Sequence, residues 1–354
     1  MDCLIVASTE PYAGKTGVTA ALLLEAAERG VVAGYFKPFG TMPVVMGDYE
    51  TDSDAAYLSS LAALKAPAEL VCPVVRTRAL VEQVLAGEAP PVVDRVLDAY
   101  RTIGHDVQIV FVEGPSDMIQ GTVFGLDLQR LATMLCGRVL LLHRPGTAEL
   151  PEELVHASDI LGDALLGVLI NDVSSARLEV TRTRVAAYLE RVGISVFGVL
   201  EHDASLSAVS VAELVAELDG VVLAGETGLD EPVESFMVGA MGQEKALRYF
   251  RRRARKAVVT GGDRSDVQLA ALETDTRCVI CTGGMAPSSI VLSRADELGI
   301  PMVLVEMDTL SAVEHMEVLF GHVRVHDAVK VARIRELLAE QADLDAIFTT
   351  LGGS

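Results

Sequence analysis

The stretch LIVASTEPYAGKTGVTAALLL, residues 4–24, decides the fold of this chain. Its first four residues, Leu4 to Ala7, are apolar and predict a buried strand. A polar segment, Ser8 to Ala13, predicts a turn, and Gly14-Lys15-Thr16 then opens a run whose apolar spacing is typical of a helix. Strand, loop, Gly-Lys-Thr and helix follow one another in the order of a phosphate-binding P-loop.

The chemistry of phosphate binding explains why these residue types occur together. Backbone N–H groups of such a loop and the positive end of the helix bind phosphate oxygens. Lys15 would reach the β and γ phosphates, and the Thr16 hydroxyl would hold Mg²⁺. A full motif has glycine where this chain has Thr9, but the strand and helix around Gly-Lys-Thr make an ordinary turn the weaker interpretation. The predicted nucleotide contacts of the loop are Thr9, Glu10, Ala13, Gly14, Lys15, Thr16 and Gly17.

Composition limits the class of protein. The chain has 354 residues, 50% of them hydrophobic, which is enough for a large core and about two domains. No apolar run reaches the roughly 18–20 residues that span a bilayer. The N-terminus lacks the features of a secretory signal, and the five cysteines are scattered, so we expect a cytoplasmic protein. A net charge of −21 argues against nucleic acid and anionic membranes as partners.

Alternating apolar runs predict an α/β fold with a doubly wound parallel sheet. The predicted strands of the first half are residues 4–7, 31–36, 107–112, 139–142, 166–170 and 194–200, and the predicted helices are residues 55–64, 80–85, 92–100, 126–135, 150–161 and 181–191. Ligands of such sheets gather at the carboxyl ends of the strands. Polar residues at those ends are therefore candidates for the site.

Three of these strands end in candidate residues. Lys37 follows the second strand and would join the phosphate site, in preference to lying in solvent. Glu113 closes the central strand in the Walker-B position, where a carboxylate binds Mg²⁺ directly or through water. Asn171 ends a later strand and would either contact a purine base or start a turn.

A loop rich in carboxylates, residues 47–54, precedes the helix predicted at 55–64. Asp52, Ser53 or Asp54 would cap that helix. A carboxylate of the same loop would also suit Mg²⁺, which is usually held by one or two protein carboxylates. The two roles can belong to different residues of the loop.

Taken together, the motifs of the first 200 residues resemble those of dethiobiotin synthetase, a P-loop ATPase of the MinD and cobyrinate-synthase type. The resemblance depends on the P-loop stretch, GYFKPFG, Asp52-Ser53-Asp54-Ala55, FVEG and VLINDV, in this order. It implies that Lys15 and Lys37 bind the phosphates of ATP, that Thr16, Asp54 and Glu113 ligate Mg²⁺, and that Asn171 contacts the base. The loop after Glu113 differs from the family's Gly-Ala-Gly-Gly, which argues against biotin synthesis.

The second half predicts another α/β domain, with strands at 257–260, 277–281 and 301–305 and helices at 208–218, 244–250 and 287–298. Its Asp263-Arg264 and Thr282-Gly283-Gly284 resemble the DRTGG domain over residues 205–320. The two loops would form either an anion or nucleotide pocket or a dimer contact. The predicted domains are residues 1–204, 205–320 and a C-terminal strand and helix at 321–354.

Together the two halves resemble the N-terminal part of long phosphotransacetylases and free-standing relatives of that part. An acetyltransferase domain would need about 300 further residues, so we do not expect acetyl transfer by this chain alone.

Three further patterns have structural explanations. Cys278 and Cys281 lie three apart on a strand and face opposite sides, which argues against a metal or redox pair. The run 251–256 is interpreted as a helix-end charge cluster in preference to an anion or nucleic-acid site. Residues 322–326 alternate as in a strand with a polar outer face, and residues 329–347 predict one amphipathic helix.

Two functions remain open. The first is an enzyme that uses ATP and Mg²⁺ to transfer a phosphoryl group to a small carboxylate acceptor, with a DRTGG domain that senses a ligand or forms a homodimer. The second is a non-catalytic, nucleotide-responsive regulator of acetyl-CoA or acetyl-phosphate metabolism.

Overall fold

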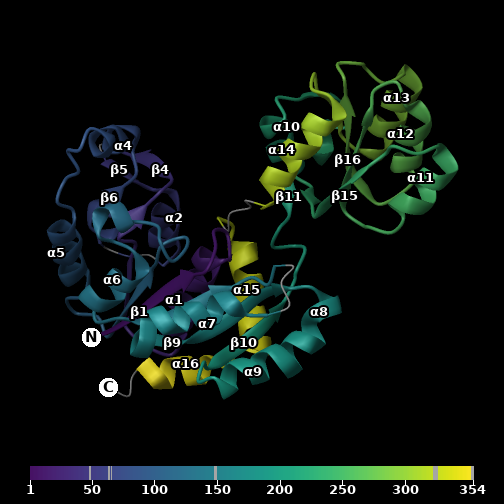
Figure 1. The fold of residues 1–354 in the computed structure, drawn as a ribbon. Coiled ribbons are helices and arrows are strands. Elements are labelled where there is room, and N and C mark those ends of the chain that lie inside the picture. The colour runs from purple at the N-terminus through teal and green to yellow at the C-terminus, as the bar shows by residue number, and fades with distance from the viewer. Residues whose placement is uncertain (48, 63, 65, 147–149, 322–325, 352–354) are drawn as a thin grey trace. The chain divides into compact units, whose positions relative to one another are not determined.

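The computed structural model describes residues 1–47, 49–62, 64, 66–146, 150–321 and 326–351, and Figure 1 shows its ribbon. The chain forms two compact units. The first comprises Met1–His202 and Val325–Ser354, and the second comprises Asp203–Arg324. The C-terminal segment therefore belongs to the first unit. The strand expected at residues 322–326 lies outside the described residues except for His326.

The first unit alternates strands and helices along most of its length. Its elements are β1 (Asp2–Ser8), α1 (Lys15–Glu28), β2 (Ala33–Phe36), β3 (Phe39–Gly40), β4 (Pro43–Met46), β5 (Tyr49–Asp52), α2 (Ser53–Leu61), α3 (Ala68–Val71), β6 (Val74–Val75), α4 (Arg78–Leu85), α5 (Val93–Ile103), β7 (Ile109–Glu113), α6 (Leu128–Met134), β8 (Arg138–His143), α7 (Glu152–Leu161), β9 (Leu165–Val173), α8 (Ser175–Val180), α9 (Ala186–Arg191), β10 (Val196–Glu201), α15 (Ala328–Gln341) and α16 (Leu344–Leu351). The predicted strands are all present, with ends that differ by a few residues.

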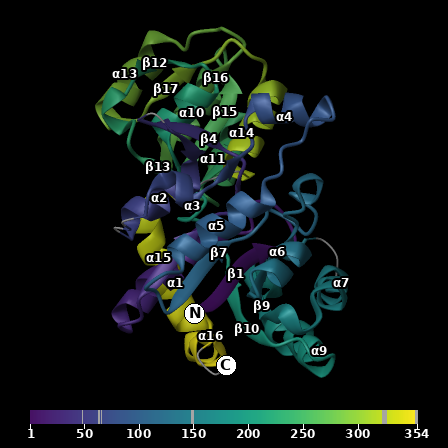
Figure 2. The ribbon, with the colours of Figure 1, turned by 90° about the vertical axis from the view of Figure 1, so that its left-hand side faces the viewer.

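Six strands form a parallel sheet in the order β10-β9-β8-β1-β7-β2. The strands β1 and β7 at its centre are almost wholly buried, as expected for a sheet that is covered on both faces. Figure 2 shows α1 and α15 on one side of this sheet and α6 and α7 on the other. Right-handed crossovers from β1 to β2 and from β7 to β8 run in opposite directions along the sheet, so their helices cover opposite faces. The predicted doubly wound fold is confirmed.

The single helix predicted at residues 329–347 is wrong. The structure has two helices, α15 and α16, with a break at Ala342, whose backbone is extended. Ala342 forms a β-bridge with Gly198 of β10, and the Asp343 N–H donates to the Phe197 carbonyl at 2.7 Å. The sheet edge therefore competes with the helix for these backbone groups, and hydrophobic spacing does not reveal that competition.

The region between β2 and α2 also differs from a plain loop. The strands β4 and β5 pair as an antiparallel hairpin, which delivers Asp52 to the first turn of α2. The Asp52 carboxylate accepts a hydrogen bond from the Asp54 N–H at 2.9 Å and is the N-cap of α2. The predicted capping role therefore belongs to Asp52, which leaves the Asp54 carboxylate for other partners.

The second unit is a three-layer α/β structure. Its elements are β11 (Val209–Ser210), α10 (Val211–Glu217), β12 (Val221–Ala224), β13 (Pro232–Val233), β14 (Ser235–Val238), α11 (Gln243–Phe250), β15 (Lys256–Gly261), α12 (Ser265–Leu272), β16 (Thr276–Thr282), α13 (Ser289–Leu298), β17 (Met302–Leu304) and α14 (Thr309–Gly321). The sheet order is β12-β17-β16-β15-β14, and only β12 pairs antiparallel.

Two apolar layers hold the sheet of the second unit. On one face of the sheet, the apolar side chains of α11, α12 and α13 pack against the strands. On the other face, those of α10 and α14 do. Cys278 belongs to one layer and Cys281 to the other, so the prediction that they face opposite sides of β16 is confirmed. In the ranges that the structure describes, no helix is long and apolar enough to cross a bilayer.

Candidate functional site

The P-loop joins the end of β1 to the start of α1. Gly14, immediately before the helix, has a φ of 96°, in the left-handed region that favours glycine. A Cβ atom at this position would lie 2.7 Å from the Asn171 side-chain nitrogen. That nitrogen donates to the Ala13 carbonyl at 2.9 Å. Asn171, at the carboxyl end of β9, therefore supports the loop in this structure, and a contact with a base remains a prediction.

Lys15 is buried beneath this loop. Its Nζ donates to the Ser8 hydroxyl at 2.8 Å and to the Ser116 carbonyl at 3.5 Å. Burial lowers the pKa of Lys15 to about 8, although the nearby charge of Glu113 opposes the shift. A buried ammonium that has only neutral hydrogen-bond partners is ready to bind an anion, because an anion would relieve the cost of burial.

Lys37, at the end of β2, lies among three carboxylates. Its Nζ is 2.7 Å from oxygens of Asp52 and Asp54 and 3.0 Å from Glu113 Oε1. Burial alone would lower the pKa of Lys37, but the charges of Glu113, Asp54 and Asp52 outweigh it and raise that pKa well above its ordinary value. Lys37 is therefore at the expected edge of the sheet, but its partners here are carboxylates.

Glu113 links the P-loop to Lys37. Because β7 pairs with β1, Glu113 lies beside Val6 at the base of the loop. Its carboxylate accepts hydrogen bonds from the Thr16 hydroxyl and the Tyr35 hydroxyl, each at 3.1 Å. Burial raises the pKa of Glu113, and the charge of Lys37 opposes that rise. The predicted Thr16 and Glu113 pair is thus in direct contact.

Asp54 contacts a residue from the far end of the chain. Its carboxylate accepts a hydrogen bond from Lys37 at 2.7 Å and lies 2.8 Å from His326 Nε2. The His326 ring stacks on Tyr57 of α2, with ring centroids 4.9 Å apart. Burial alone would raise the pKa of Asp54, but the His326 hydrogen bond and the Lys37 charge outweigh it and hold the pKa below its usual value.

Asp52 anchors the cluster to the backbone. One of its oxygens accepts from the N–H groups of Thr41 and Met42, and the other from Lys37 and the Asp54 N–H. Because Asp52 is fully buried and these donors use both of its oxygens, it is a structural member of the cluster.

Two predicted loop contacts, Thr9 and Glu10, use their side chains elsewhere. The Thr9 hydroxyl lies 2.9 Å from His143 Nδ1, and the Glu10 carboxylate accepts from the Arg144 N–H at 2.7 Å. Both side chains therefore tie the loop to the end of β8. Any nucleotide contact of Thr9 or Glu10 in this arrangement would come from the backbone.

The loop after Glu113 covers the lysine side of the P-loop. The Ser116 carbonyl accepts from Ser8 and Lys15, and the Asp117 carboxylate accepts from the N–H groups of Ile119 and Gln120. This loop is held by its own hydrogen bonds and contacts Lys15 directly. It occupies the position where the sequence departs from the resembled family.

In the second unit, the two predicted loops lie at adjacent strand ends, because Gly261 of β15 pairs with Thr282 of β16. The N–H of Gly283 donates to the Met307 carbonyl, and that of Gly284 donates to the Val305 carbonyl. Arg264 donates to the Met241 carbonyl at 2.8 Å and pairs with Asp266. These backbone donors are used within the fold and are not directed at a ligand.

Three residues of the first-unit site were missed from sequence. Asp52 is predicted as a cap or as one of the loop carboxylates suited to Mg²⁺, but not as a partner of Lys37. Tyr35 gives no signal within an apolar strand, and His326 lies 272 residues from Asp54 in the chain. His326 belongs to the alternating segment 322–326, but its contact with Asp54 depends on the tertiary fold.

Comparison with protein families defines the class. Residues 2–210 match the AAA domain family, and residues 213–319 match the DRTGG domain. Because the first match spans more than half of the chain, the chain belongs to the AAA domain family, with a P-loop domain followed by a DRTGG domain. The predicted fold class and both domain resemblances are confirmed.

Among curated relatives, the chain is similar to the phosphate acetyltransferase of Synechocystis sp., with 25% identity over 284 residues that cover 75% of this chain and 40% of that protein. It is also similar to the uncharacterized protein YtoI of Bacillus subtilis, with 31% identity over 107 residues, 30% of this chain and 24% of that protein. The chain thus spans less than half the length of these relatives.

Solved structures give weaker likenesses. The cell division protein MinD of Aquifex aeolicus has 12% identity and a TM-score of 0.36, covering 58% of this chain and 84% of that one. The CBS and DRTGG domains of Clostridium perfringens pyrophosphatase, solved with diadenosine tetraphosphate, have 18% identity and a TM-score of 0.29, covering 53% and 82%. TM-scores this low carry no argument about function.

The lowered pKa of Lys15 predicts proton uptake when phosphate binds. In the free protein Lys15 is about half protonated near pH 8, and a bound phosphate would return its pKa toward the ordinary 10.5. Binding of ATP should therefore take up about half a proton per chain at that pH and almost none about two units lower. Titration calorimetry in buffers of different ionisation enthalpy measures this uptake. Lys15→Arg, which stays charged, should bind ATP without it; equal uptake by both proteins would contradict the assignment.

Removal of Lys37 should strongly destabilise the first unit. Lys37→Met would leave three buried carboxylates without their counter-ion, at a cost of about 3–5 kcal/mol in the free energy of unfolding. Urea unfolding measures the loss, and Arg78→Met, which removes an exposed pair with Glu82, should cost less than about 1 kcal/mol. Similar small losses for both variants would show that the cluster is not held by Lys37.

Proposed function

We propose that the first unit binds ATP together with Mg²⁺ and transfers the γ-phosphoryl group to a small carboxylate acceptor. The observation that carries this proposal is the convergence of Lys15, Thr16, Lys37, Asp54 and Glu113 at one edge of the sheet, from separate segments of the chain. These residues supply the two cations and the oxygen ligands that phosphoryl transfer uses.

The donor set fits Mg²⁺. Thr16 Oγ1, Asp54 and Glu113 are hard oxygen ligands, and Mg²⁺ with a nucleotide usually takes one or two carboxylates and completes its shell with phosphate oxygens and water. In the described residues no group of three or more His, Cys, Asp or Glu side chains is arranged to hold a metal by itself. The Lys37 ammonium, between Asp54 and Glu113, supports the fit because it is a cation at the same carboxylates.

The chain's own residues would then position and neutralise the phosphates. Lys15 would hold the β and γ phosphate oxygens while the backbone of the loop around Gly14 donates to them. Lys37, released from the carboxylates, would reach the transferred group or the acceptor. Mg²⁺, when bound, would neutralise charge on the β and γ oxygens. A carboxylate acceptor is already a nucleophile, so the site needs no general base.

A second candidate is a nucleotide-responsive regulator of acetyl-CoA or acetyl-phosphate metabolism. One observation favours it: the carboxylate of Asp54 bonds to His326, in the segment through which the chain returns from the second unit. A nucleotide that changes the partners of Asp54 would directly change the hydrogen bond that holds His326 in that segment. The similarity to a phosphate acetyltransferase over 75% of this chain suggests the metabolic context.

Hydrolysis of ATP distinguishes the two functions. An enzyme should convert ATP to ADP in a Mg²⁺-dependent manner, slowly with water as the acceptor and faster with the carboxylate that takes the phosphoryl group. Lys15→Ala should lower the rate of ADP formation by at least about a hundredfold because it removes charge stabilisation of the transition state. Tight Mg²⁺-dependent binding of ATP without turnover, lost in Lys15→Ala, would support the regulator. Failure of the wild-type protein to bind ATP at all would contradict both.

Matched carboxylate variants test the metal ligands in the same assay. Asp54→Asn and Glu113→Gln should raise the Mg²⁺ concentration needed for half-maximal binding or turnover by about tenfold or more, because each removes a charged ligand. Asp52→Asn removes the same charge from the same cluster, but at the helix cap. It should lower stability and leave the Mg²⁺ requirement nearly unchanged; an equal effect of all three would contradict the assignment.

A further inference from the structure

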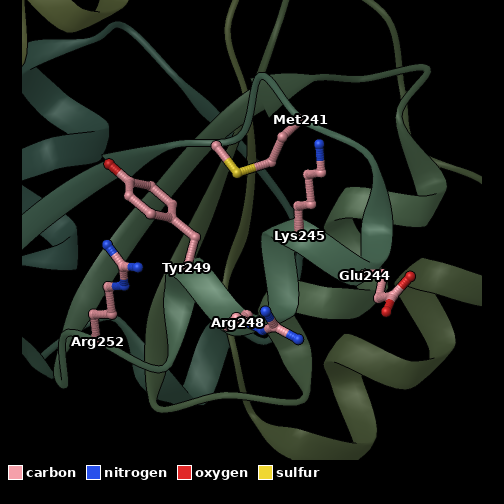
Figure 3. A pocket seen from close by; sticks show the side chains of 6 residues that line it. All are labelled: Met241, Glu244, Lys245, Arg248, Tyr249 and Arg252. Carbon is pink, nitrogen blue, oxygen red and sulfur yellow. The ribbon is translucent and has the colours of Figure 1, made fainter.

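A second charged site lies far along the chain from the P-loop, on α11 of the second unit. A pocket of about 360 Å³ is lined there by Met241, Glu244, Lys245, Arg248, Tyr249 and Arg252. Figure 3 shows Tyr249 between Arg252 and Met241, with Lys245 and Arg248 extending from the same helix. The volume is within the range of about 300–1,000 Å³ that is usual for small-molecule sites.

The sequence of α11 explains why these side chains share one face. Residues 245, 248 and 249 follow the spacing i, i+3 and i+4, which places them along one side of α11. Arg252 lies in the turn just after α11 ends at Phe250 and lines the same pocket. The opposite side carries Ala246 and Phe250, which are fully buried in the core of the unit. The core therefore fixes the helix and leaves the charged side open.

The charges of this face are unbalanced. Lys245, Arg248 and Arg252 stand against the single carboxylate Glu244, and in the part of the chain that the structure describes no ion pair involves any of the three cations. This occurs in a chain of net charge −21. Like charges three and four residues apart destabilise a helix, so the arrangement has a cost in stability.

The helix dipole accounts for only part of the pattern. Cations near the C-terminus of a helix are favourable, which covers Arg248 and Arg252, but Lys245 lies in the first turn of α11, where a cation is unfavourable. A helix-end charge cluster, the interpretation given to the run 251–256, covers Arg252 but not Lys245. An anion bound between the cations would account for all three.

The pocket also has an aromatic and apolar wall. Tyr249 is half-buried, and the Arg252 guanidinium lies 5.9 Å from the centre of its ring. Met241 forms the neighbouring wall, and its carbonyl accepts the hydrogen bond from Arg264 at 2.8 Å. Arg264 of the Asp263-Arg264 motif is thus a positioning residue for this wall. A planar group would find a stacking surface next to the cations.

We propose that this pocket binds a phosphorylated small molecule of the nucleotide class, separately from the P-loop. Phosphate groups would bind Lys245, Arg248 and Arg252, and the base would lie against Tyr249 and Met241. The cations suit the phosphates of such a ligand, and the ring suits its base. A simple anion would need only the cations, so the ring favours a nucleotide.

Calorimetry with ATP and with inorganic tripolyphosphate tests the proposal on the full chain that carries Lys15→Ala. This background weakens the P-loop site, so the outcome does not depend on the function proposed for the first unit. ATP should still bind at one site per chain without Mg²⁺, and Arg248→Ala combined with Arg252→Ala should weaken it by at least about tenfold, since each contact is charge-assisted. Arg294→Ala, an exposed arginine of α13 in the same unit, should leave the affinity unchanged.

The aromatic wall has its own readout. Tyr249→Leu keeps an apolar side chain in the partly buried position and should weaken ATP by about fivefold or more while tripolyphosphate is unaffected, because only the nucleotide stacks on the ring. Circular dichroism and the unfolding midpoint establish that each variant is folded. The proposal is overturned if no nucleotide binds the Lys15→Ala chain, if binding survives the double arginine substitution, or if an acidic peptide or an RNA binds the pocket and ATP and tripolyphosphate do not.

Discussion

The buried ammonium of Lys37 among three carboxylates is the interaction on which the site depends. An unpaired charge inside a protein is far more costly than a hydrogen bond can offset, so each member of this cluster requires the others. Asp52 fixes the cluster to the backbone through the N–H groups of Thr41 and Met42. Glu113 connects it to Thr16 at the start of α1. The P-loop and the carboxylates therefore form one electrostatic unit, held at the carboxyl edge of the sheet.

The cluster also joins distant parts of the chain. The sheet order places β2, β7 and β1 side by side, so the ends that carry Lys37, Glu113 and the P-loop meet. The hairpin β4–β5 brings Asp52 and Asp54 to the same place. His326 completes the set from the segment that re-enters the first unit after the DRTGG domain. Any ligand that binds both oxygens of the Asp54 carboxylate would compete with Lys37 for one oxygen and with His326 for the other.

Much of the fold and part of the site could be predicted from sequence, for physical reasons that differ between residues. The strand before Gly14-Lys15-Thr16 and the buried strand before Glu113 are local patterns, and parallel topology then requires their ends to meet. Asp54 could be singled out only through the resemblance to dethiobiotin synthetase, because Asp52 and Asp54 are equally suited by residue type to cap the helix or to bind Mg²⁺. The carboxylate partners of Lys37 could not be predicted, because pairing depends on side-chain positions across three elements.

Other features depend on contacts that no local pattern encodes. The break at Ala342 results from pairing with the edge strand β10, and the spacing of residues 329–347 is compatible with one helix. The whole second unit separates His326 from Asp54 in the sequence, so their contact depends on the tertiary fold. Of the pocket's three cations, only Arg252 belongs to the basic run 251–256 that the sequence shows. The pocket beside Tyr249 also requires Met241 and the Arg264 hydrogen bond that holds it.

The most direct test is a crystal structure of the chain with Mg²⁺ and a non-hydrolysable ATP analogue. The account predicts phosphates on Lys15 and a metal about 2.0–2.1 Å from Thr16 Oγ1 or from Asp54 and Glu113 oxygens, with the Lys37 ammonium moved away from at least one of these carboxylates. A P-loop without nucleotide in such crystals, or a nucleotide bound at the P-loop while Lys37 keeps all three carboxylates and no metal is present, would contradict it.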